Sequence, residues 1–283
     1  MSTFLLTGLA MLAFAANSIL CRLALAKGLI DAGSFTLFRL ISGAVLLLVM
    51  LLFTGKGKAS APNLRFSLLA GVSLFGYAAL FSFAYLKLTA GTGALLLFGA
   101  VQLSLLALYW WQGERFKALE IIGISVSVAG FVYLMLPSVS RPDTLSALLM
   151  IGSGVCWAGF TALGKQAESP SLGISWGFIS ASIVALFLSP FLLNNIHITL
   201  NGALLAIASG AIASGLGYLL WYQVMKSLSL LQAAVSQLSV PALALVIGAL
   251  LLGESLTAHA IISGTVILGG IALVFTSRAS NKD

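Results

Sequence analysis

Long apolar runs separated by short polar segments make up almost the whole chain. The uncharged runs are 1–21, 40–55, 66–86, 88–113, 121–140, 144–164, 169–225, 227–253 and 255–277. A helix that crosses about 30 Å of hydrocarbon needs roughly 20 apolar residues, and most of these runs have that length. Run 169–225 is too long for one helix, and its middle, PFLLNNIHITLN (190–201), carries a proline, three asparagines and a histidine that favour a turn.

The pattern therefore predicts ten transmembrane helices. The second begins before its uncharged run and takes in Arg39 as an interior charge. The predicted spans lie near 3–25, 33–54, 64–87, 90–111, 118–137, 144–165, 172–190, 200–225, 229–252 and 258–277. The connections between them are short, which leaves no soluble domain of any size.

Composition supports a protein whose surface faces lipid. Hydrophobic residues make up 60% of the 283 residues and charged residues only 7%, against about 25% in an average soluble domain. This balance excludes a secreted or cytosolic enzyme and a nucleic-acid-binding domain. The formal charge of +7 does not change that conclusion, because the Lys and Arg residues are scattered singly between apolar runs, as charges at membrane boundaries are.

The distribution of basic residues favours cytoplasmic termini. With ten spans both termini lie on one side, and placing them inside puts nine basic residues in the cytoplasm and five on or toward the outside. The first span alone argues for the opposite orientation, since Arg22 and Lys27 follow it and no basic residue precedes it.

The two halves of the chain, 1–139 and 140–283, look like one duplicated unit. Gly113-Glu114 near the end of the fourth span reappears as Gly253-Glu254 near the end of the ninth, 140 positions later, and a glycine-rich apolar span follows each pair. Each half holds five spans, an odd number, so the second copy must enter the membrane inverted. The predicted fold is an all-α membrane protein of two inverted five-helix repeats around a central cavity, a plan that recurs in secondary transporters.

The order of these features resembles EamA-type transporters of the drug/metabolite transporter superfamily. The ten-span pattern, the two Gly-Glu pairs, Pro241 in the ninth span and the Phe38-Arg39 pair in the second carry the resemblance. It implies two tandem EamA units, a location in the bacterial inner membrane, and export of amino acids, other small metabolites or toxic organic compounds. The fourth span has Val101 where the ninth has Pro241, so only the second half is expected to break a helix at the site.

The sequence offers no set of residues for catalysis or for a cofactor. Gly159–Lys165 matches most of a phosphate-binding loop, but Gln166 follows it and no strand precedes it. The two histidines fall in or beside loops, and all seven acidic residues lie at helix ends, in loops or at the terminus. We therefore expect no enzyme, no metal and no cofactor, and no exchanger built on a buried acid. Glu114 and Glu254 are expected to cap helix ends or pair with neighbours.

Aromatic and amide side chains in six spans are candidates for a pocket at the membrane midplane. Several follow one another at intervals of four residues, which places them on one face of a helix. The predicted substrate-binding residues are Asn17, Tyr77, Phe81, Phe98, Gln102, Trp157, Tyr218 and Gln237, with Pro241 as the helix break. The alternative is that the amides tie helices together and the aromatic rings serve packing or the membrane interface.

Arg39 is not included in this set. It could hold a substrate carboxylate or phosphate, but it could equally extend to the interface, pair with Asp31 or cap neighbouring carbonyl groups.

The predicted function is a carrier that exports small organic metabolites, with amino acids, including aromatic ones, as the first candidates. Two complete halves in one chain make a functional monomer plausible. One alternative is a drug-type exporter of lipophilic cations, which would need anionic or strongly aromatic cavity walls. The other is a non-transporting membrane scaffold, which would need a loop or tail for docking a partner.

Overall fold

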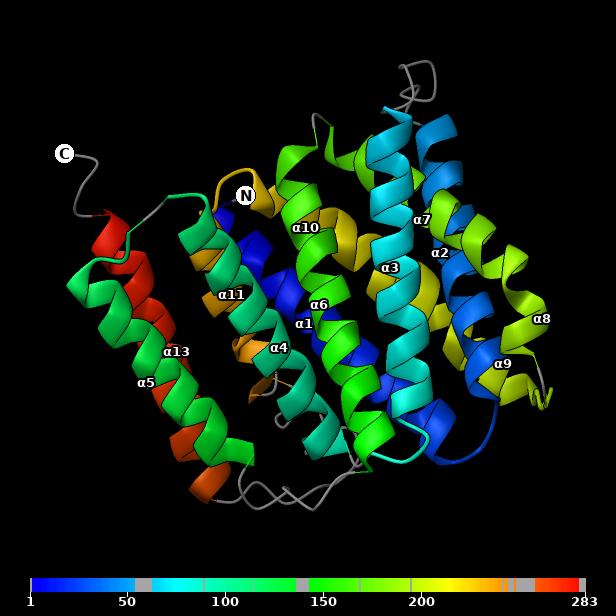
Figure 1. The fold of residues 1–283 in the computed structure, drawn as a ribbon, viewed down its shortest axis with the longest axis horizontal. Helices are drawn as coiled ribbons and strands as arrows, with labels where there is room; N and C mark the ends of the chain where they lie inside the picture. Colours follow the sequence, from blue (N-terminus) through cyan, green and yellow to red (C-terminus); the bar gives the residue numbers. More distant parts are fainter. Residues whose placement is uncertain are drawn as a thin grey trace.

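The computed structural model is a bundle of helices (Figure 1). It describes residues 2–53, 63–88, 90–113, 115–135, 143–167, 169–193, 195–240, 242–243, 247 and 258–279. The first half contains α1 (Thr3–Cys21), the π-helical turn η1 (Arg22–Ala26), α2 (Ala32–Phe53), α3 (Leu64–Ala84), α4 (Ala90–Trp111) and α5 (Ala118–Met135). The second contains α6 (Thr144–Gln166), α7 (Pro170–Phe187), α8 (Ser189–Leu192), α9 (Leu200–Ala208), the π-helix η4 (Ser209–Leu216), α10 (Gly217–Met225), α11 (Leu230–Gln237) and α13 (Ala258–Ala279).

Within the described residues, six helical segments are long and apolar enough to cross a membrane, and each overlaps a predicted span. They are Thr3–Leu25, Ala32–Phe53, Leu64–Ala84, Thr144–Gln166, Pro170–Phe187 and Leu200–Met225. The predicted break within 169–225 is confirmed, since α7 ends at Phe187 and α9 begins at Leu200. Many large apolar side chains on these helices remain exposed, which suits a surface covered by lipid. The chain is therefore an all-helical, multi-pass membrane protein.

Polar side chains cap the N-terminal ends of several helices. The side chain of Asp143 accepts a hydrogen bond from the Ser146 amide at the start of α6, and Thr199 does the same for Gly202 at the start of α9. Ser229 and Gln232 form a reciprocal capping box at the start of α11. These caps satisfy backbone donors that would otherwise lack partners at the helix ends.

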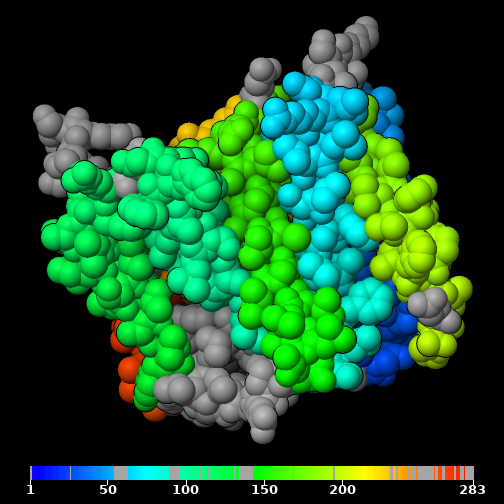
Figure 2. All heavy atoms as spheres, viewed as in Figure 1, coloured from blue at the N-terminus to red at the C-terminus, as the bar shows by residue number. Residues whose placement is uncertain are grey.

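Helices from the two halves pack against one another in a recurring pattern. α3 packs on α6 and α7, while α9, η4 and α10 together pack on α1 and α2. α2 also packs on α7, and α5 on α13. Figure 2 shows α3 and α6 side by side on the outer face of the bundle, with α4 and α5 beyond α6.

Glycines allow the closest of these approaches. A Cβ on Gly123 of α5 would lie 2.8 Å from the carbonyl oxygen of Gly270 on α13, and a Cβ on Gly270 would lie 2.6 Å from the carbonyl oxygen of Gly123. The Ser127 hydroxyl donates to the Ile267 carbonyl at 3.3 Å across the same contact. Small residues at such contacts let helix backbones meet where lipid supplies no hydrophobic driving force.

Small residues of α9 and η4 pack on α2 and on the segment before it. A Cβ on Gly202 would clash with the carbonyl group of Leu29, and one on Gly210 would clash with the carbonyl group of Arg39 and the hydroxyl of Ser42. Gly210 lies in η4, whose wider helical turns run alongside the middle of α2. This contact fixes the position of Arg39 relative to the second half.

We predict that Gly210→Ala destabilises the protein by about 1–3 kcal/mol, because a methyl group cannot be accommodated against the α2 backbone. Thermal unfolding of the purified protein in detergent measures the effect. Gly8→Ala is the matched control, since beyond its own helix no atom lies within 4 Å of the position its Cβ would take, and it should leave the melting temperature unchanged or slightly raised. Equal melting temperatures for the two variants would contradict the assigned contact.

Candidate functional site

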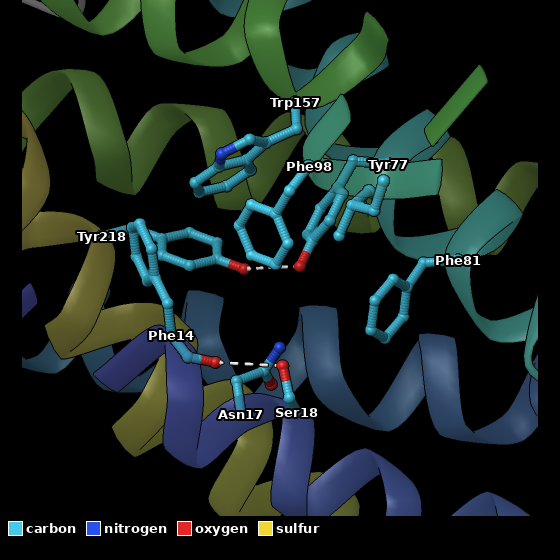
Figure 3. Close-up of a pocket in the computed structure, with 9 residues that line it drawn as sticks. Phe14, Asn17, Ser18, Tyr77, Phe81, Phe98, Trp157 and Tyr218 are labelled. Carbon is cyan, nitrogen blue, oxygen red and sulfur yellow. Dashed lines mark hydrogen bonds between the residues drawn. The ribbon is translucent and has the colours of Figure 1, made fainter. Parts of the chain in front are cut away.

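A hollow lies between helices of both halves, near the middle of the bundle. Its empty volume is about 340 Å³, which includes space open to solvent. Figure 3 shows side chains from several helices converging on it. The lining residues are Phe14, Asn17 and Ser18 on α1, Tyr77 and Phe81 on α3, Leu97 and Phe98 on α4, Trp157 on α6 and Tyr218 on α10.

Six of the eight predicted substrate-binding residues line this hollow: Asn17, Tyr77, Phe81, Phe98, Trp157 and Tyr218. Gln102 and Gln237 are buried but lie outside the lining. Phe14, Ser18 and Leu97 also line it and are absent from the predicted set. Phe14 could have been found from the sequence, since it precedes Asn17 by one helical turn. Pro241, Glu114 and Glu254 lie outside the described residues.

Aromatic rings from the two halves meet across the hollow. The ring of Trp157 lies 5.2 Å from Phe14, 4.8 Å from Tyr77 and 4.7 Å from Tyr218, measured between centroids. Phe14 and Tyr218 lie 5.5 Å apart in an edge-to-face arrangement. Rings at such separations are in direct contact and attract one another. The hollow is therefore narrow in this structure, and the rings must move apart to admit a molecule of amino acid size.

Two of the predicted amides tie helices together. Oδ1 of Asn17 accepts a hydrogen bond of 2.5 Å from the Ser209 hydroxyl, which joins α1 to η4. Oε1 of Gln237 accepts from the indole N–H of Trp157, and its Nε2 donates to the Ala233 carbonyl at 3.2 Å. Gln237 therefore holds a lining side chain in place rather than forming the wall. Gln102 differs, because neither of its side-chain polar atoms has a hydrogen-bond partner in the described part of the chain, although the residue is only 3% exposed.

Arg39 of α2 is the main residue that the sequence reasoning left out. It is 1% exposed and does not extend to the interface. Its Nε donates to the Ser214 hydroxyl at 3.1 Å, and its Nη2 donates to the hydroxyls of Tyr77 at 3.2 Å and Tyr218 at 2.6 Å. Its guanidinium carbon lies 5.0 Å from the ring centroid of Tyr77 and 5.8 Å from that of Phe81. The charge thus borders the hollow through three of its lining residues.

The suggested pairing of Arg39 with Asp31 does not occur, because Asp31 joins two loops instead. Its Oδ1 accepts from the Ser34 amide at 2.8 Å and its Oδ2 from the His197 amide at 3.0 Å, while its own amide donates to the His197 carbonyl at 2.8 Å. Thr199 donates to the Leu29 carbonyl through both its amide and its hydroxyl. These contacts tie the α1–α2 connection to the connection before α9 and close the bundle at this end.

Partial burial acts to raise the pKa of Asp31, but the hydrogen bonds from Ser34 and His197 outweigh it and hold that pKa below the ordinary 3.8. Lys87, at the end of α3, pairs with Asp143 at 3.4 Å, and both side chains are exposed. Among the described residues, no three His, Cys, Asp or Glu side chains come together in a group that could hold a metal.

Comparisons with known proteins identify relatives along the chain. Residues 144–276 match the sequence profile of the EamA-like transporter family. The chain is 44% identical over 279 residues to the uncharacterized protein PA1977 of Pseudomonas aeruginosa, covering 98% of this chain and 95% of that protein. It is 27% identical over 238 residues to the uncharacterized transporter YyaM of Bacillus subtilis, covering 78% of this chain and 77% of that one.

The fold also occurs among solved structures. One structure, titled only as the crystal structure of a protein, superposes with a TM-score of 0.79 at 18% sequence identity and covers 97% of each chain. This likeness concerns the fold alone.

We predict that Asp31→Asn lowers stability by about 1 kcal/mol near neutral pH, because a neutral amide accepts hydrogen bonds more weakly than a carboxylate. Folding lowers the pKa of Asp31, so its contribution is present above pH 3.8 and is lost as the pH falls through the lower pKa of the folded state. The two proteins should therefore converge in melting temperature only at pH values below the lowered pKa of Asp31 in the folded protein.

Thermal unfolding in detergent across a pH series makes the comparison. His197→Ala is the control, since only the backbone of His197 takes part in the contact, and it should reproduce the wild-type pH profile. A difference between Asp31→Asn and wild type that is independent of pH would contradict the role given to the carboxylate.

Proposed function

Because the chain belongs to the EamA-like transporter family, we propose that it is an alternating-access carrier that exports small organic metabolites. Amino acids, including aromatic ones, are the first candidate substrates. In this proposal the protein lies in the bacterial inner membrane with both termini in the cytoplasm and works as a monomer. The hollow between the two halves is the observation that carries the proposal.

The proposal includes a ten-helix bundle of two inverted repeats, 1–139 and 140–283. The contacts between helices support it, because they come in related pairs. If the first span of each half is equivalent, and so on through the fifth, the packing of α3 on α6 corresponds to that of α10 and η4 on α1. The packing of α3 on α7 likewise corresponds to that of α9 and η4 on α2. The contacts α2–α7 and α5–α13 then join equivalent spans across the axis of the repeat.

The location of the hollow supports transport over a scaffold role. Transporters built from inverted repeats bind substrate between the repeats, near the midplane, and move one repeat against the other. Here α1, α3 and α4 of the first half face α6 and α10 of the second across the hollow. Rocking the halves would separate Trp157 and Tyr218 from Phe14 and Tyr77, and so would widen the site.

The Asp31 contacts would then close the outer end of the pathway. With the termini in the cytoplasm, the connection between η1 and α2 lies on the outside, where Asp31 binds the backbone of His197. Release of a substrate to the outside would require these loops to part. Hydrogen bonds at an exposed position are suited to this, since water replaces them when they break.

The walls favour a substrate with an apolar or aromatic body. Aromatic rings also attract organic cations, which keeps lipophilic-cation efflux as the second candidate. Arg39 opposes it, because a buried positive charge within 5.8 Å of two lining rings repels a cation in the same space.

Solute counterflow in proteoliposomes tests the proposal. Vesicles are preloaded with an unlabelled panel of amino acids and metabolites, and entry of trace labelled solute is followed without a pH gradient. We expect entry above that of protein-free vesicles, and Tyr77→Ala, Tyr218→Ala and Gln237→Ala should each reduce it by about tenfold or more, since each removes a wall of the hollow or its support.

Tyr133→Ala is the matched control, because Tyr133 is an exposed tyrosine on α5 away from the hollow, and it should leave counterflow unchanged. Unchanged counterflow in all three site variants would reject the hollow as the substrate site. Resistance to lipophilic cations that depends on the proton gradient, without amino acid counterflow, would favour the second candidate.

A further inference from the structure

Two N–H groups of Arg39 have no partner among the described residues, although the side chain is buried. A guanidinium carries five N–H donors. One donates to Ser214 from Nε, and two donate to Tyr77 and Tyr218 from Nη2. Nη1, which carries the remaining two, has no hydrogen-bond partner, and the side chain is 1% exposed.

The positive charge of Arg39 also has no anion beside it in the described part of the chain. Three of the seven acidic residues are described, and none of them pairs with Arg39: Asp31 accepts from the amides of Ser34 and His197, Glu120 accepts from the Lys117 amide, and Asp143 pairs with Lys87. The groups that do contact the guanidinium are neutral hydroxyls and aromatic rings. A buried charge without a counter-ion is strongly destabilising, so an arginine is retained in this state only where something else compensates it.

The guanidinium lies directly behind side chains that line the hollow. Its two tyrosine partners both line the hollow, and their hydroxyl groups point toward each other in Figure 3, 3.5 Å apart. The Tyr77 oxygen accepts from both Arg39 and Tyr218, which leaves its own proton available to donate. Two N–H groups of Arg39 and the O–H group of Tyr77 are therefore left without an acceptor, next to side chains that line the hollow.

We propose that this group of donors binds the carboxylate of the transported molecule, and that the carboxylate, rather than an amino group, is what the site recognises. This inference rests on the proposed carrier function and specifies its substrate class as small monocarboxylates with an apolar or aromatic body. Charge-assisted hydrogen bonds from a guanidinium to a carboxylate are among the strongest that proteins make. One unpaired positive charge matches one negative charge, which favours a carboxylate over a doubly charged phosphate.

The same arrangement leaves an amino group without a charged partner. None of the residues that line the hollow is acidic, so an ammonium group would meet only aromatic faces and the side chains of Asn17 and Ser18. An acid that lacks the amino group should therefore bind at least as well as the corresponding amino acid.

Binding to the purified wild-type protein in detergent tests this without requiring transport. The probes share one aromatic body and differ in the end group: 3-phenylpropanoate, its neutral amide 3-phenylpropanamide, the amine 2-phenylethylamine, and phenyl phosphate. We expect 3-phenylpropanoate to raise the melting temperature and to change the tryptophan fluorescence of the protein, with an affinity at least tenfold above those of the amide and the amine. Sodium chloride at equal concentration should give neither change.

The proposal would be overturned if 3-phenylpropanamide or chloride changed the melting temperature and the fluorescence as much as 3-phenylpropanoate does. A stronger effect of phenyl phosphate than of the carboxylate would overturn the choice of anion.

Variants then connect the effect to Arg39. Arg39→Gln should abolish the response to 3-phenylpropanoate, and Arg39→Lys, which keeps the charge but not the planar donors, should retain a weakened response. Lys27→Gln is the matched control, because it removes an exposed positive charge far from the lining and should respond as wild type does. A full response in Arg39→Gln would overturn the proposal. If that variant does not fold, the comparison of carboxylate, amide and amine on the wild type still decides the question.

Counterflow separates this inference from the proposed function. Exchange of 3-phenylpropanoate and phenylalanine, but not of 2-phenylethylamine, supports both. If 2-phenylethylamine competes for exchange with the same potency as 3-phenylpropanoate, the protein is a carrier, but the proposed recognition of the carboxylate is wrong. Selective binding of the carboxylate to the purified protein without exchange of any solute supports the anion site and contradicts the carrier.

Discussion

The buried guanidinium of Arg39 is the interaction on which the centre of this bundle depends. It joins α2 to Tyr77 on α3 and, across the two halves, to Ser214 on η4 and Tyr218 on α10. In a low-dielectric interior each donor that is left unmet raises the free energy of the folded state, so these hydroxyl groups are held at positions set by the charge. The hydroxyls in turn set the orientation of two rings that line the hollow. The geometry of the site therefore follows from one polar cluster rather than from the packing of aromatic rings alone.

The same cluster explains why η4 departs from regular α-helix. Ser209, Gly210 and Ser214 all lie in this π-helical segment: Ser209 binds Asn17, Gly210 allows contact with the α2 backbone at Arg39, and Ser214 binds the guanidinium. π-helical turns within α-helices occur frequently at functional sites, because the wider turn changes which residues share a face. Here one wide segment presents two hydroxyls and a glycine to two neighbouring helices. A regular helix of the same length would rotate some of them away.

The sequence correctly predicts six of the ten proposed spans, and it predicts the site only in part, for a physical reason. Lipid requires every spanning segment to be a long apolar helix, so hydropathy alone places Thr3–Leu25 or Leu64–Ala84. Helical spacing likewise brings Tyr77 and Phe81 to one face. The partners of Arg39 lie up to 179 residues away in sequence, and no local pattern indicates them. The same holds for Gln237, whose contact with Trp157 spans 80 residues. The roles given to Pro241, Glu114 and Glu254 stay predictions.

Movement between the halves would act directly on the Arg39 cluster. The bond from Arg39 to Tyr77 lies within the first half, whereas those to Ser214 and Tyr218 cross to the second. If the halves separate to admit a molecule, the crossing bonds break and expose more donors on a charge that already has two unmet. A bound carboxylate would supply acceptors at that moment and compensate the charge. The free energy of separating the halves would therefore be high without a bound anion and much lower with an anion bound at Arg39. A ligand can shift a conformational equilibrium only by its difference in affinity for the two states, and a buried cation that loses its hydroxyl partners provides such a difference.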